Sequence, residues 1–338
     1  MLTRDPCVLA AANVVQLGDP TLDRYLEFVA SRARPNTVLA AASDLKLFFG
    51  IVDRIPADVT TADVFDFIAA QRRPVRSGRV VRLADGEAGL ALSTIKRRLA
   101  SVSGLFGYLV MCGELERNPV PRGLATRRRG SRGVALIRSP YLLPKILTPG
   151  EVDALLGALR TWRDRAMVEA MVLGGLRRCE VLGVRFEDLR AGEQRLFIAD
   201  GKGGHQRLIP ASPRFFSSVA NFLSIERPDN ADAEKVFVVL KGPRRGQPLS
   251  ADGLDEIVLG ARRRAGLTHG TCHQLRHTCL TRLREAGMAL EAVQAQAGHR
   301  SIESTRIYLH LSNEWLAGEF MRAAQIIDAA RQGEEAAR

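Results

Sequence analysis

Hydrophobic side chains recur at helical spacing through the first third of the chain. From Leu22 to Ser31 the apolar positions follow one another at intervals of three and four residues, which is the repeat of one helix face. The same repeat predicts three further helices, over residues 37–52, 62–71 and 93–112. Pro119 ends this region, because a proline disfavours helical backbone in the residue before it. Residues 19–120 therefore predict a compact helical domain.

A second patterned region begins at Leu147. Thr148 and Glu151 have the spacing of a capping box, and Pro149 suits the first turn of a helix. Helices are predicted over residues 149–160, 162–173, 177–183, 250–264 and 313–331, and short strands over residues 195–198, 207–210 and 237–240. The predicted fold class is therefore mainly α with a small β-sheet, in which a helical domain precedes a mixed α+β domain over residues 147–330.

Three segments contain too little apolar pattern to belong to either domain. Residues 1–18 predict a loose N-terminal arm, and residues 331–338 predict a C-terminal tail. Residues 121–146 are dense in arginine and glycine, which predicts a basic linker. Within the linker, a flexible, solvated connector and contact with nucleic-acid phosphates fit equally well, and the candidates for such contact are Arg127, Arg128 and Arg129.

The composition narrows the class of partner. Hydrophobic residues make up 46% of the 338, which predicts folded domains and not a disordered chain. The formal net charge of +12 favours a polyanionic partner, with DNA or RNA ahead of a membrane, and no apolar run is long enough to span a bilayer. The five cysteines are odd in number and form no Cys-x-x-Cys pair, so neither a disulfide framework nor a zinc knuckle is expected, and a reducing cytoplasm fits.

Candidate chemistry is concentrated near the C-terminal end, where five of the six histidines lie between residues 269 and 311. His273 and Arg276 are three residues apart at the start of a predicted helix and so share one face. His299 and Tyr308 follow in the same stretch. Arginine suits a phosphate, histidine moves protons near neutral pH, and tyrosine can be a covalent nucleophile. On a basic chain this set indicates covalent phosphoryl transfer at a nucleic-acid backbone.

Other interpretations of this stretch were weighed against that one. His273 and His277 have the spacing of two zinc ligands, but the glutamate that serves zinc peptidases as general base is replaced by Gln274. Cys272 and Cys279 flank the histidines, so a metal cluster is conceivable, although small buried residues are the simpler role for both. Each histidine taken alone is more typical of an ordinary helix surface.

Two further motifs lie upstream. Arg177 and Glu180 are three residues apart on one face of a short predicted helix, where a structural ion pair is the simplest interpretation. The Gly-Lys-Gly-Gly segment of residues 201–204 lies between two predicted strands, and it predicts a mobile hairpin that presents Lys202 at its turn. Each pattern alone is weak, because many surface hairpins and helices look the same.

Taken together, these motifs resemble those of the tyrosine recombinases, the phage-type integrases and Xer-like proteins. The likeness is carried by Gly175-Leu-Arg177 with Glu180, Lys202 in Gly-Lys-Gly-Gly, His273-Gln-Leu-Arg276-His-Thr278, Gly298-His299 and Tyr308-Leu-His310. The helical half is also similar to the family's core-binding domain, and the second half would be the mixed α+β tyrosine recombinase catalytic domain. One departure is Ala297, where leucine is more usual, and this change concerns packing and not chemistry.

The resemblance implies how the site would handle charge. Arg177 and Arg276 would hold the scissile phosphate and stabilise its developing charge. His299 would add a hydrogen bond to the phosphate, and Glu180 would support the site. Because arginines carry the charge that metal ions carry in other nucleases, no metal ion or other cofactor is implied.

The resemblance also implies how protons and bonds would move. Tyr308 would attack the phosphate and form a 3′-phosphotyrosyl link, while His273 takes its proton. Lys202 would protonate the leaving 5′ hydroxyl. The link conserves the bond energy, so rejoining to a second strand needs no ATP.

The expected partner is a double-stranded DNA recombination site, bound by a homo-tetramer on two sites, with the need for a sister recombinase left open. Three basic residues lie near the start of the helix predicted over residues 93–112: Lys96, Arg97 and Arg98. They fit contact with the DNA backbone and a solvated helix surface equally well. The apolar face of residues 313–331 fits docking on a neighbouring subunit, although docking on its own domain is the simpler reading. The expected location is the cytoplasm, at the nucleoid.

Three functions stay open at this point. The leading one is site-specific DNA recombination, as integration or transposition, for a mobile element or phage. A relaxing enzyme similar to the type IB topoisomerases would use the same residues, although the separate helical half favours a recombinase. A DNA-binding accessory protein with dispensable catalysis is the third, and the complete set of catalytic positions argues against it.

Overall fold

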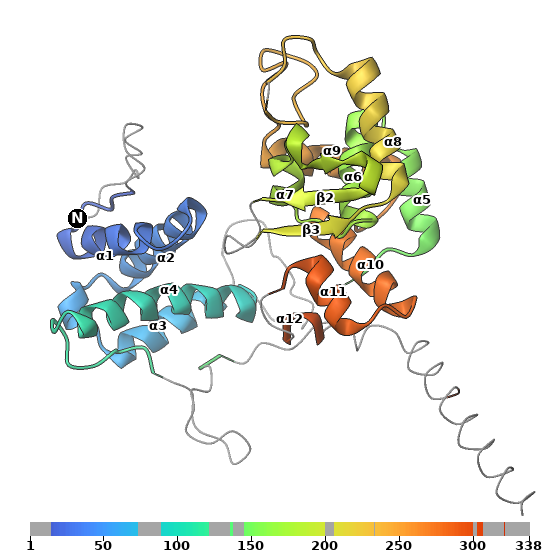
Figure 1. Cartoon of the computed structure of the whole chain (residues 1–338). Helices are drawn as coiled ribbons and strands as arrows, with labels where there is room; N and C mark the ends of the chain where they lie inside the picture. The colour runs from blue at the N-terminus through green and yellow to red at the C-terminus, as the bar shows by residue number, and fades with distance from the viewer. Residues whose placement is uncertain are drawn as a thin grey trace, which may run out of the picture. The chain divides into compact units, whose positions relative to one another are not determined.

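The computed structural model describes residues 15–73, 89–121, 136–137, 145–199, 206–232, 234–299, 303–306 and 321. The chain divides into two compact units, Met1–Tyr141 and Leu142–Arg338 (Figure 1). The ends of the arm, linker and tail given above stay predictions. In the described part of the chain we find no helix with the length and apolarity needed to span a membrane.

The described part of the N-terminal unit is helical. It contains α1 (Pro20–Ala30), α2 (Pro35–Val52), the 3-10 turn η1 (Pro56–Asp58), α3 (Thr61–Arg72) and α4 (Leu92–Met111). Each helix predicted here from the apolar repeat is present, with ends shifted by one or two residues. Pro35 lies in the first turn of α2 and not ahead of it, because its fixed φ is already helical and its missing N–H has no partner to lose there.

Aromatic rings from three helices form the centre of this unit. Phe48 of α2 lies edge to face with Phe67 of α3 and with Phe106 of α4, at centroid distances of 4.9 and 6.2 Å. All three side chains are fully buried. Edge-to-face pairs place the positive rim of one ring against the negative face of the other, so they add to the hydrophobic burial that holds the helices together.

The C-terminal unit combines helices with a small sheet. Its described helices are α5 (Pro149–Gly157), α6 (Trp162–Val172), α7 (Arg178–Gly183), α8 (Pro213–Asn221), α9 (Ala251–Arg264), α10 (Cys272–Glu285), α11 (Leu290–Ala297) and α12 (Glu303–Arg306). The 3-10 turns η2 (Phe186–Asp188) and η3 (Ala191–Glu193) flank the first strand, and the π-helical segment η4 (Phe222–Glu226) extends α8. The strands are β1 (Leu189–Arg190), β2 (Arg195–Ile198) and β3 (Arg207–Pro210).

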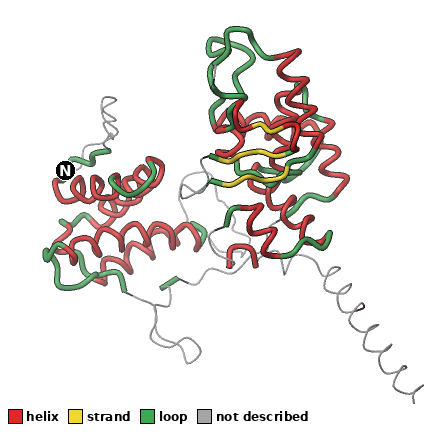
Figure 2. Tube along the Cα trace, viewed as in Figure 1, coloured by secondary structure: helices red, strands yellow, loops and turns green. Residues whose placement is uncertain are grey.

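The three strands form an antiparallel sheet in the order β1-β2-β3, drawn in yellow in Figure 2. Leu196 in the middle strand pairs with Leu189 on one side and Ile209 on the other. Leu196 and Ile209 are buried, so this face of the sheet belongs to the core. Because side chains alternate along a strand, Arg207 lies on the same inward face as Ile209.

Helix α6 lies at the centre of this unit and is buried on nearly all sides, against α8 and α10. Its polar members are satisfied: Arg163 binds Asp164, and Glu169 accepts a hydrogen bond of 2.7 Å from Ser218. Buried polar groups without such partners are costly. The capping box predicted at the start of α5 is confirmed, since Thr148 and Glu151 bond to each other's backbone N–H.

Several predicted elements differ in the structure. Residues 237–240 form no regular strand but an isolated bridge between Val238 and Pro248, because a proline has no N–H to continue a ladder. The pattern did not predict β1, α8 or α11. Helix α5 ends at Gly157, three residues earlier than predicted. The helix predicted over residues 313–331 lies outside the described residues, except for Met321.

Candidate functional site

The first arginine of the candidate site, Arg177, is placed by the turn that ends α6. Gly175 has φ of +70°, a backbone conformation that a side chain would strain, and Leu176 is buried. Arg177 then caps the start of α7, where its backbone N–H donates to Oε2 of Glu180 at 2.9 Å. Its guanidinium donates to Oε1 of the same carboxylate at 2.7 Å and to the carbonyl of Gly298 at 3.1 Å. The predicted ion pair between Arg177 and Glu180 is thus present and links α7 to the end of α11.

Glu180 forms the centre of a cluster of arginines. Its side chain is fully buried, and besides Arg177 it accepts two hydrogen bonds from Arg207, at 3.0 and 2.9 Å. Nη1 of Arg276 lies 3.7 Å from Oε2 of the same carboxylate. Burial by itself raises the pKa of Glu180. The hydrogen bonds from Arg207 and from the backbone of Arg177, together with the charges of both arginines, lower it by more, so the pKa of Glu180 lies below its usual value. The carboxylate is therefore ionised and surrounded by three positive charges.

Arg207 was missed by the reasoning from sequence. The signal that could have found it is its place in the strand that follows the Gly-Lys-Gly-Gly segment, on the inward face shared with Ile209. An arginine is seldom buried in a strand unless its guanidinium is paired with a carboxylate. Its partner Glu180 lies 27 residues away in sequence, so spacing alone did not indicate the pair.

Arg276 comes from α10 and is almost fully buried, with 3% of its side chain exposed. Nη1 donates to the carbonyl of Gly175 and Nη2 to the carbonyl of Ala297, both at 2.6 Å. These carbonyls lie just after α6 and at the end of α11, so two separate chain turns fix the orientation of the guanidinium. A hydrogen-bond donor that is already oriented needs no reorganisation when negative charge develops beside it, so it stabilises that charge effectively.

Gln274, at the position where a zinc peptidase would have its general base, is occupied by helix capping. Its side-chain oxygen accepts hydrogen bonds from the N–H groups of Gly270 and Thr271, both at 2.9 Å. In the part of the chain that the structure describes, no group of three or more His, Cys, Asp or Glu side chains is arranged to hold a metal ion. Cys272 and Cys279 are buried, as the simpler interpretation predicted, and burial raises the pKa of both thiols to about 12.

His299 follows Gly298, which ends α11 with φ of +60°. Its Nε2 atom lies 3.2 Å from Nη2 of Arg276, and its Nδ1 atom lies 3.0 Å from Oγ1 of Thr305. An arginine can only donate, so Nε2 accepts and the ring proton is on Nδ1, facing Thr305. Burial and the charges of Arg276 and Arg177 lower the pKa of His299 to about 4, so the ring is neutral at pH 7.

His273 and His277 form a pair on α10. Their Nε2 atoms are 2.8 Å apart and their rings are edge to face. One of the two nitrogens carries the shared proton, so the rings cannot both be charged. Burial, followed by the charges of His273 and Arg276, lowers the pKa of His277 to about 4. His273 is exposed, as a base that meets a substrate needs to be.

The structure therefore brings four of the predicted site residues into one network of hydrogen bonds and ion pairs, and these are Arg177, Glu180, Arg276 and His299. His273 lies one turn before Arg276 on the same helix. Lys202 and Tyr308 lie outside the described residues, as do the linker candidates Arg127, Arg128 and Arg129.

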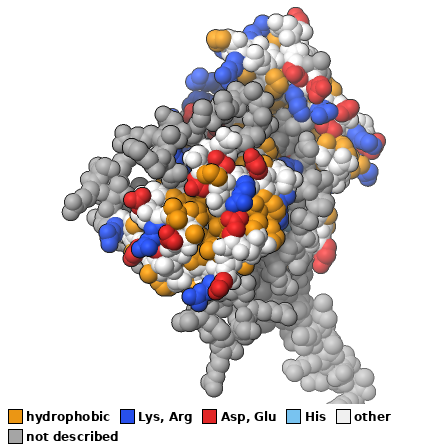
Figure 3. Space-filling view, turned by 90° about the vertical axis from the view of Figure 1, so that its left-hand side faces the viewer, with side chains coloured by type: hydrophobic (Ala, Val, Ile, Leu, Met, Phe, Trp, Pro, Cys, Tyr) orange, Lys and Arg blue, Asp and Glu red, His pale blue; other side chains and the backbone are white. Residues whose placement is uncertain are grey.

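The three candidates for DNA contact in the N-terminal unit have different surroundings. Arg97 binds the buried carboxylate of Asp44 through two hydrogen bonds, and Arg98 donates to Gln71. Lys96 is exposed. On the face of this unit turned to the viewer in Figure 3, hydrophobic side chains lie beside charged ones of both signs, so this face is not uniformly basic. Contact with DNA here stays a prediction, and both Lys96 and Arg97 are exposed.

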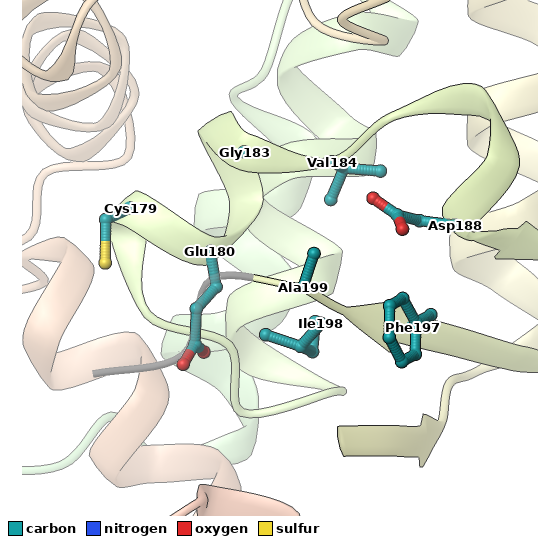
Figure 4. Close-up of a pocket in the computed structure, with 8 residues that line it drawn as sticks. All are labelled: Cys179, Glu180, Gly183, Val184, Asp188, Phe197, Ile198 and Ala199. Carbon is teal, nitrogen blue, oxygen red and sulfur yellow. The ribbon is translucent and has the colours of Figure 1, made fainter. Parts of the chain in front are cut away.

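A small hollow of about 220 Å³ lies behind α7, between that helix and the sheet (Figure 4). Val184, Phe197 and Ile198 supply much of its wall, and the carboxylate of Glu180 points away from Asp188. Only about 10 Å³ of it has room for the centre of a water-sized molecule, so the hollow can hold about one water molecule and no small-molecule ligand. Glu180 belongs to its lining, so the hollow adjoins the arginine cluster.

Comparison with known proteins shows the family to which the chain belongs. Residues 145–314 match the model of the phage integrase family. The chain is 32% identical over 241 residues to tyrosine recombinase XerC of Vibrio parahaemolyticus, covering 70% of this chain and 73% of that protein. It is 26% identical over 340 residues to transposase A from transposon Tn554 of Staphylococcus aureus, covering 93% of each.

Solved structures show the same fold. The Tn1549 transposon integrase in complex with transposon right-end DNA matches with a TM-score of 0.67 and 18% identity, covering 90% of this chain and 99% of that one. The XerH site-specific recombinase bound to a palindromic difH substrate matches with a TM-score of 0.64 and 18% identity, covering 93% and 99%. Sequence, fold and the arginine–histidine network agree, and the chain belongs to the phage integrase family, the tyrosine recombinases.

Proposed function

We propose that this tyrosine recombinase cuts and rejoins DNA strands at specific sites through a 3′-phosphotyrosyl link at Tyr308. The observation that supports this most strongly is the arrangement of Arg177 and Arg276 around Glu180, with His299 bonded to Arg276. With Arg207, three arginines surround one carboxylate, so the cluster keeps a positive charge that suits a phosphodiester. Phosphoryl transfer is catalysed mainly by such positioning and charge stabilisation.

The cleavage step follows from these roles. The oxygen of Tyr308 forms a bond to phosphorus as its proton passes to His273, and the bond from phosphorus to the 5′ oxygen breaks. The electron pair of that bond goes to the 5′ oxygen, which takes a proton from Lys202. Arg177 and Arg276 stabilise the charge on the non-bridging oxygens. Rejoining is the reverse reaction with the 5′ hydroxyl of another strand, so no external energy source is consumed.

The pairing of His273 with His277 fits the role of proton acceptor. His277 is neutral at pH 7 because of burial, and a neutral neighbour leaves His273 able to take up a proton. A hydrogen bond between the two rings also restricts how His273 turns. The ring of His273 is thus accessible to a substrate, and its orientation is restrained by His277.

The role expected for His299 requires a change when DNA binds. In the structure its Nε2 atom accepts from Arg276 and its only proton faces Thr305, so it has none to donate to a phosphate. A phosphate that accepts the Nη2 hydrogen now directed at His299 would leave Nε2 without its donor, and the negative charge of the phosphate would raise the pKa of the ring. We therefore expect His299 to take up a proton as the scissile phosphate binds, and then to donate from Nε2.

We further propose that the substrate is a double-stranded DNA site of a mobile element and that the active form is a tetramer on two sites. Support comes from the likeness to transposase A of Tn554 along 93% of each chain, and from folds shared with recombinases solved on DNA. A relaxing topoisomerase with the same chemistry remains the second candidate. It differs in outcome, because it rejoins the strand that it cut and exchanges none.

The test is to trap the covalent intermediate. A duplex carrying the recombination site, selected from random DNA by binding, is given a nick beside the cleavage position so that the released fragment diffuses away. The wild-type protein is expected to accumulate as a DNA adduct in the presence of EDTA, and Tyr308→Phe is expected to bind the duplex without forming one. An adduct formed by Tyr308→Phe, or cleavage that depends on added metal, would contradict the proposal. Strand exchange between two marked duplexes separates a recombinase from a relaxing enzyme.

A further inference from the structure

Arg207 is the member of the arginine cluster that makes no contact with the phosphate in the proposed chemistry. It lies in β3, five positions after Lys202, and 13% of its side chain is exposed. Its two terminal nitrogens donate to the two oxygens of Glu180 at 3.0 and 2.9 Å, one to each. This side-by-side geometry is the strongest form of an arginine–carboxylate pair.

The same guanidinium also contacts the end of α11. Nε donates to the carbonyl of Gln296 at 3.3 Å, and a Cβ added at Gly298 would lie only 2.8 Å from Nη1 of Arg207. Glycine at 298 therefore leaves the space in which Arg207 reaches Glu180. The residue after this glycine is His299. Arg207 therefore contacts Glu180 of α7 and also the segment that carries His299.

The charges explain why a third arginine matters. Glu180 is buried and ionised, and a carboxylate competes with a phosphate for the same guanidinium groups. If Glu180 had only Arg177 and Arg276 as neighbours, its negative charge would be offset by these two arginines alone and would weaken their attraction for a phosphate. Arg207 occupies both carboxylate oxygens, so the charges of the other two arginines are less compensated. Coulomb interactions of this kind are weakly screened in a buried site.

We infer that Arg207 is a positioning residue for DNA cleavage: it neutralises Glu180, so that Arg177 and Arg276 keep their charge for the scissile phosphate. This inference rests on the proposed function. Because Arg207 belongs to the strand that follows the predicted hairpin of Lys202, the same contact ties that strand to the phosphate-binding arginines. Arg207 itself need not touch the DNA.

The alternative is that Arg207 only holds β3 to α7. The two roles differ in the effect of removing the carboxylate. If Arg207 acts by neutralising Glu180, then Glu180→Gln, which deletes the negative charge at nearly constant size, is expected to reverse much of the loss caused by Arg207→Met. If Arg207 only packs the fold, Arg207→Met lowers the stability of the protein but leaves the attraction of the other two arginines for a phosphate unchanged, with or without Glu180→Gln.

Two measurements on the full chain test this. The first is the single-turnover rate of adduct formation on the nicked duplex, for which we expect Arg207→Met to be slower by roughly 10- to 100-fold. The second uses the Tyr308→Phe background, in which the Kd for a duplex with a normal phosphate is compared with the Kd for a duplex with an uncharged methylphosphonate at the cleavage position. The ratio of the two isolates the attraction to that one phosphate, and Arg207→Met is expected to shrink it roughly tenfold.

The control is Arg195→Met, because Arg195 lies in the neighbouring strand β2 with about half of its side chain exposed and bonds to Glu193, not to Glu180. It is expected to leave the Kd ratio unchanged. Recovery of the rate and the ratio in Arg207→Met/Glu180→Gln supports the inference, and further loss in the double variant overturns it. A wild-type protein that forms no adduct refutes the proposed function, while the Kd ratios still decide whether Arg207 governs the attraction of the arginines for a phosphate.

Discussion

The hydroxyl of Thr305 lies 3.0 Å from Nδ1 of His299, and it accepts the only proton of that neutral ring. Thr305 is fully buried in α12 and precedes Tyr308 by three residues. The contact thus joins the segment that leads to the proposed nucleophile to the histidine that contacts Arg276. This hydrogen bond agrees with the tautomer that Arg276 imposes on His299, with the proton on Nδ1.

Replacing Thr305 by valine keeps the size of the side chain but removes the acceptor for the Nδ1 proton. We expect cleavage to fall by about 5- to 30-fold, since a buried hydrogen-bond partner is worth about 1–2 kcal/mol. Thr305→Ser keeps the hydroxyl and is expected to stay within a few-fold of the wild-type rate. The single-turnover rate of adduct formation measures both. Equal losses in the two variants would show that packing and not the hydroxyl matters.

The stability of the C-terminal unit is expected to fall as the pH is lowered from about 6.5 toward 4. The folded-state pKa values of His277 and His299 are lowered from 6.5 to about 4, so between these values the unfolded chain binds more protons than the folded one. The stability contributed by the neutral rings is complete above about 6.5 and is lost as the pH falls through that window.

Urea unfolding followed by tryptophan fluorescence measures this, because both tryptophans, Trp162 and Trp315, belong to the C-terminal unit. Between about pH 6.5 and 5, most carboxylates are still ionised and the histidines dominate the slope. The variant His277→Gln/His299→Gln is expected to show a flatter dependence of the urea midpoint on pH in this range. An unchanged slope would mean that other groups titrate there.

Arg177→Lys and Arg276→Lys are each expected to slow cleavage by about 10²–10³, even though lysine keeps the charge. Arg276 donates from two nitrogens to two carbonyls that lie in different segments, which a single ammonium group cannot reproduce. Adduct formation measures the loss, and thermal unfolding separates it from misfolding. Arg195→Lys, on the exposed part of the sheet, is the matched control. Cleavage near the wild-type rate by either variant would contradict the role of that arginine in holding the phosphate.

Lys202→Ala is expected to cleave a normal phosphodiester poorly and to recover on a substrate in which sulfur replaces the 5′ bridging oxygen. A thiolate leaves without a proton, so the substitution removes the need for a general acid. Arg177→Ala is expected not to recover, because it acts on the non-bridging oxygens. If Lys202→Ala is equally slow on both substrates, this lysine positions the DNA and another group donates the proton.

In the N-terminal unit, Arg97 is expected to contribute to stability and Lys96 to DNA binding. Arg97→Met leaves the carboxylate of Asp44, which is 3% exposed, with the hydroxyl of Ser101 as its described partner. We expect a loss of about 1 kcal/mol in the free energy of unfolding, a modest value because the side chain of Arg97 is about half exposed. Lys96→Met is expected to leave stability unchanged and to reduce the slope of log K against log salt by about 0.9 if it contacts a phosphate. Thermal unfolding and DNA titrations at several salt concentrations measure the two effects.

The sequence by itself determined the helices of the N-terminal unit and the identity of the candidate site residues. Phe48 could be assigned to the buried face of the helix predicted over residues 37–52, because an apolar repeat of three and four residues can bury only one face of a helix. Arg177, Arg276 and Tyr308 could be assigned to one chemistry because their residue types and order are specific when taken together. The capping box of Thr148 and Glu151 followed from a spacing of three residues, since its contacts are local.

Tertiary structure alone decided which side chains meet. Arg207 reaches Glu180 across 27 residues, and Gly298 receives a hydrogen bond from Arg177 across 121, so neither contact leaves a periodic signal in the chain. The tautomer of His299 depends on Arg276 on one side and Thr305 on the other, and no local pattern specifies both. Periodicity reports which face of an element is buried, whereas the partner of a buried charge is fixed by how separate elements pack, because only there are the charges close enough to interact strongly.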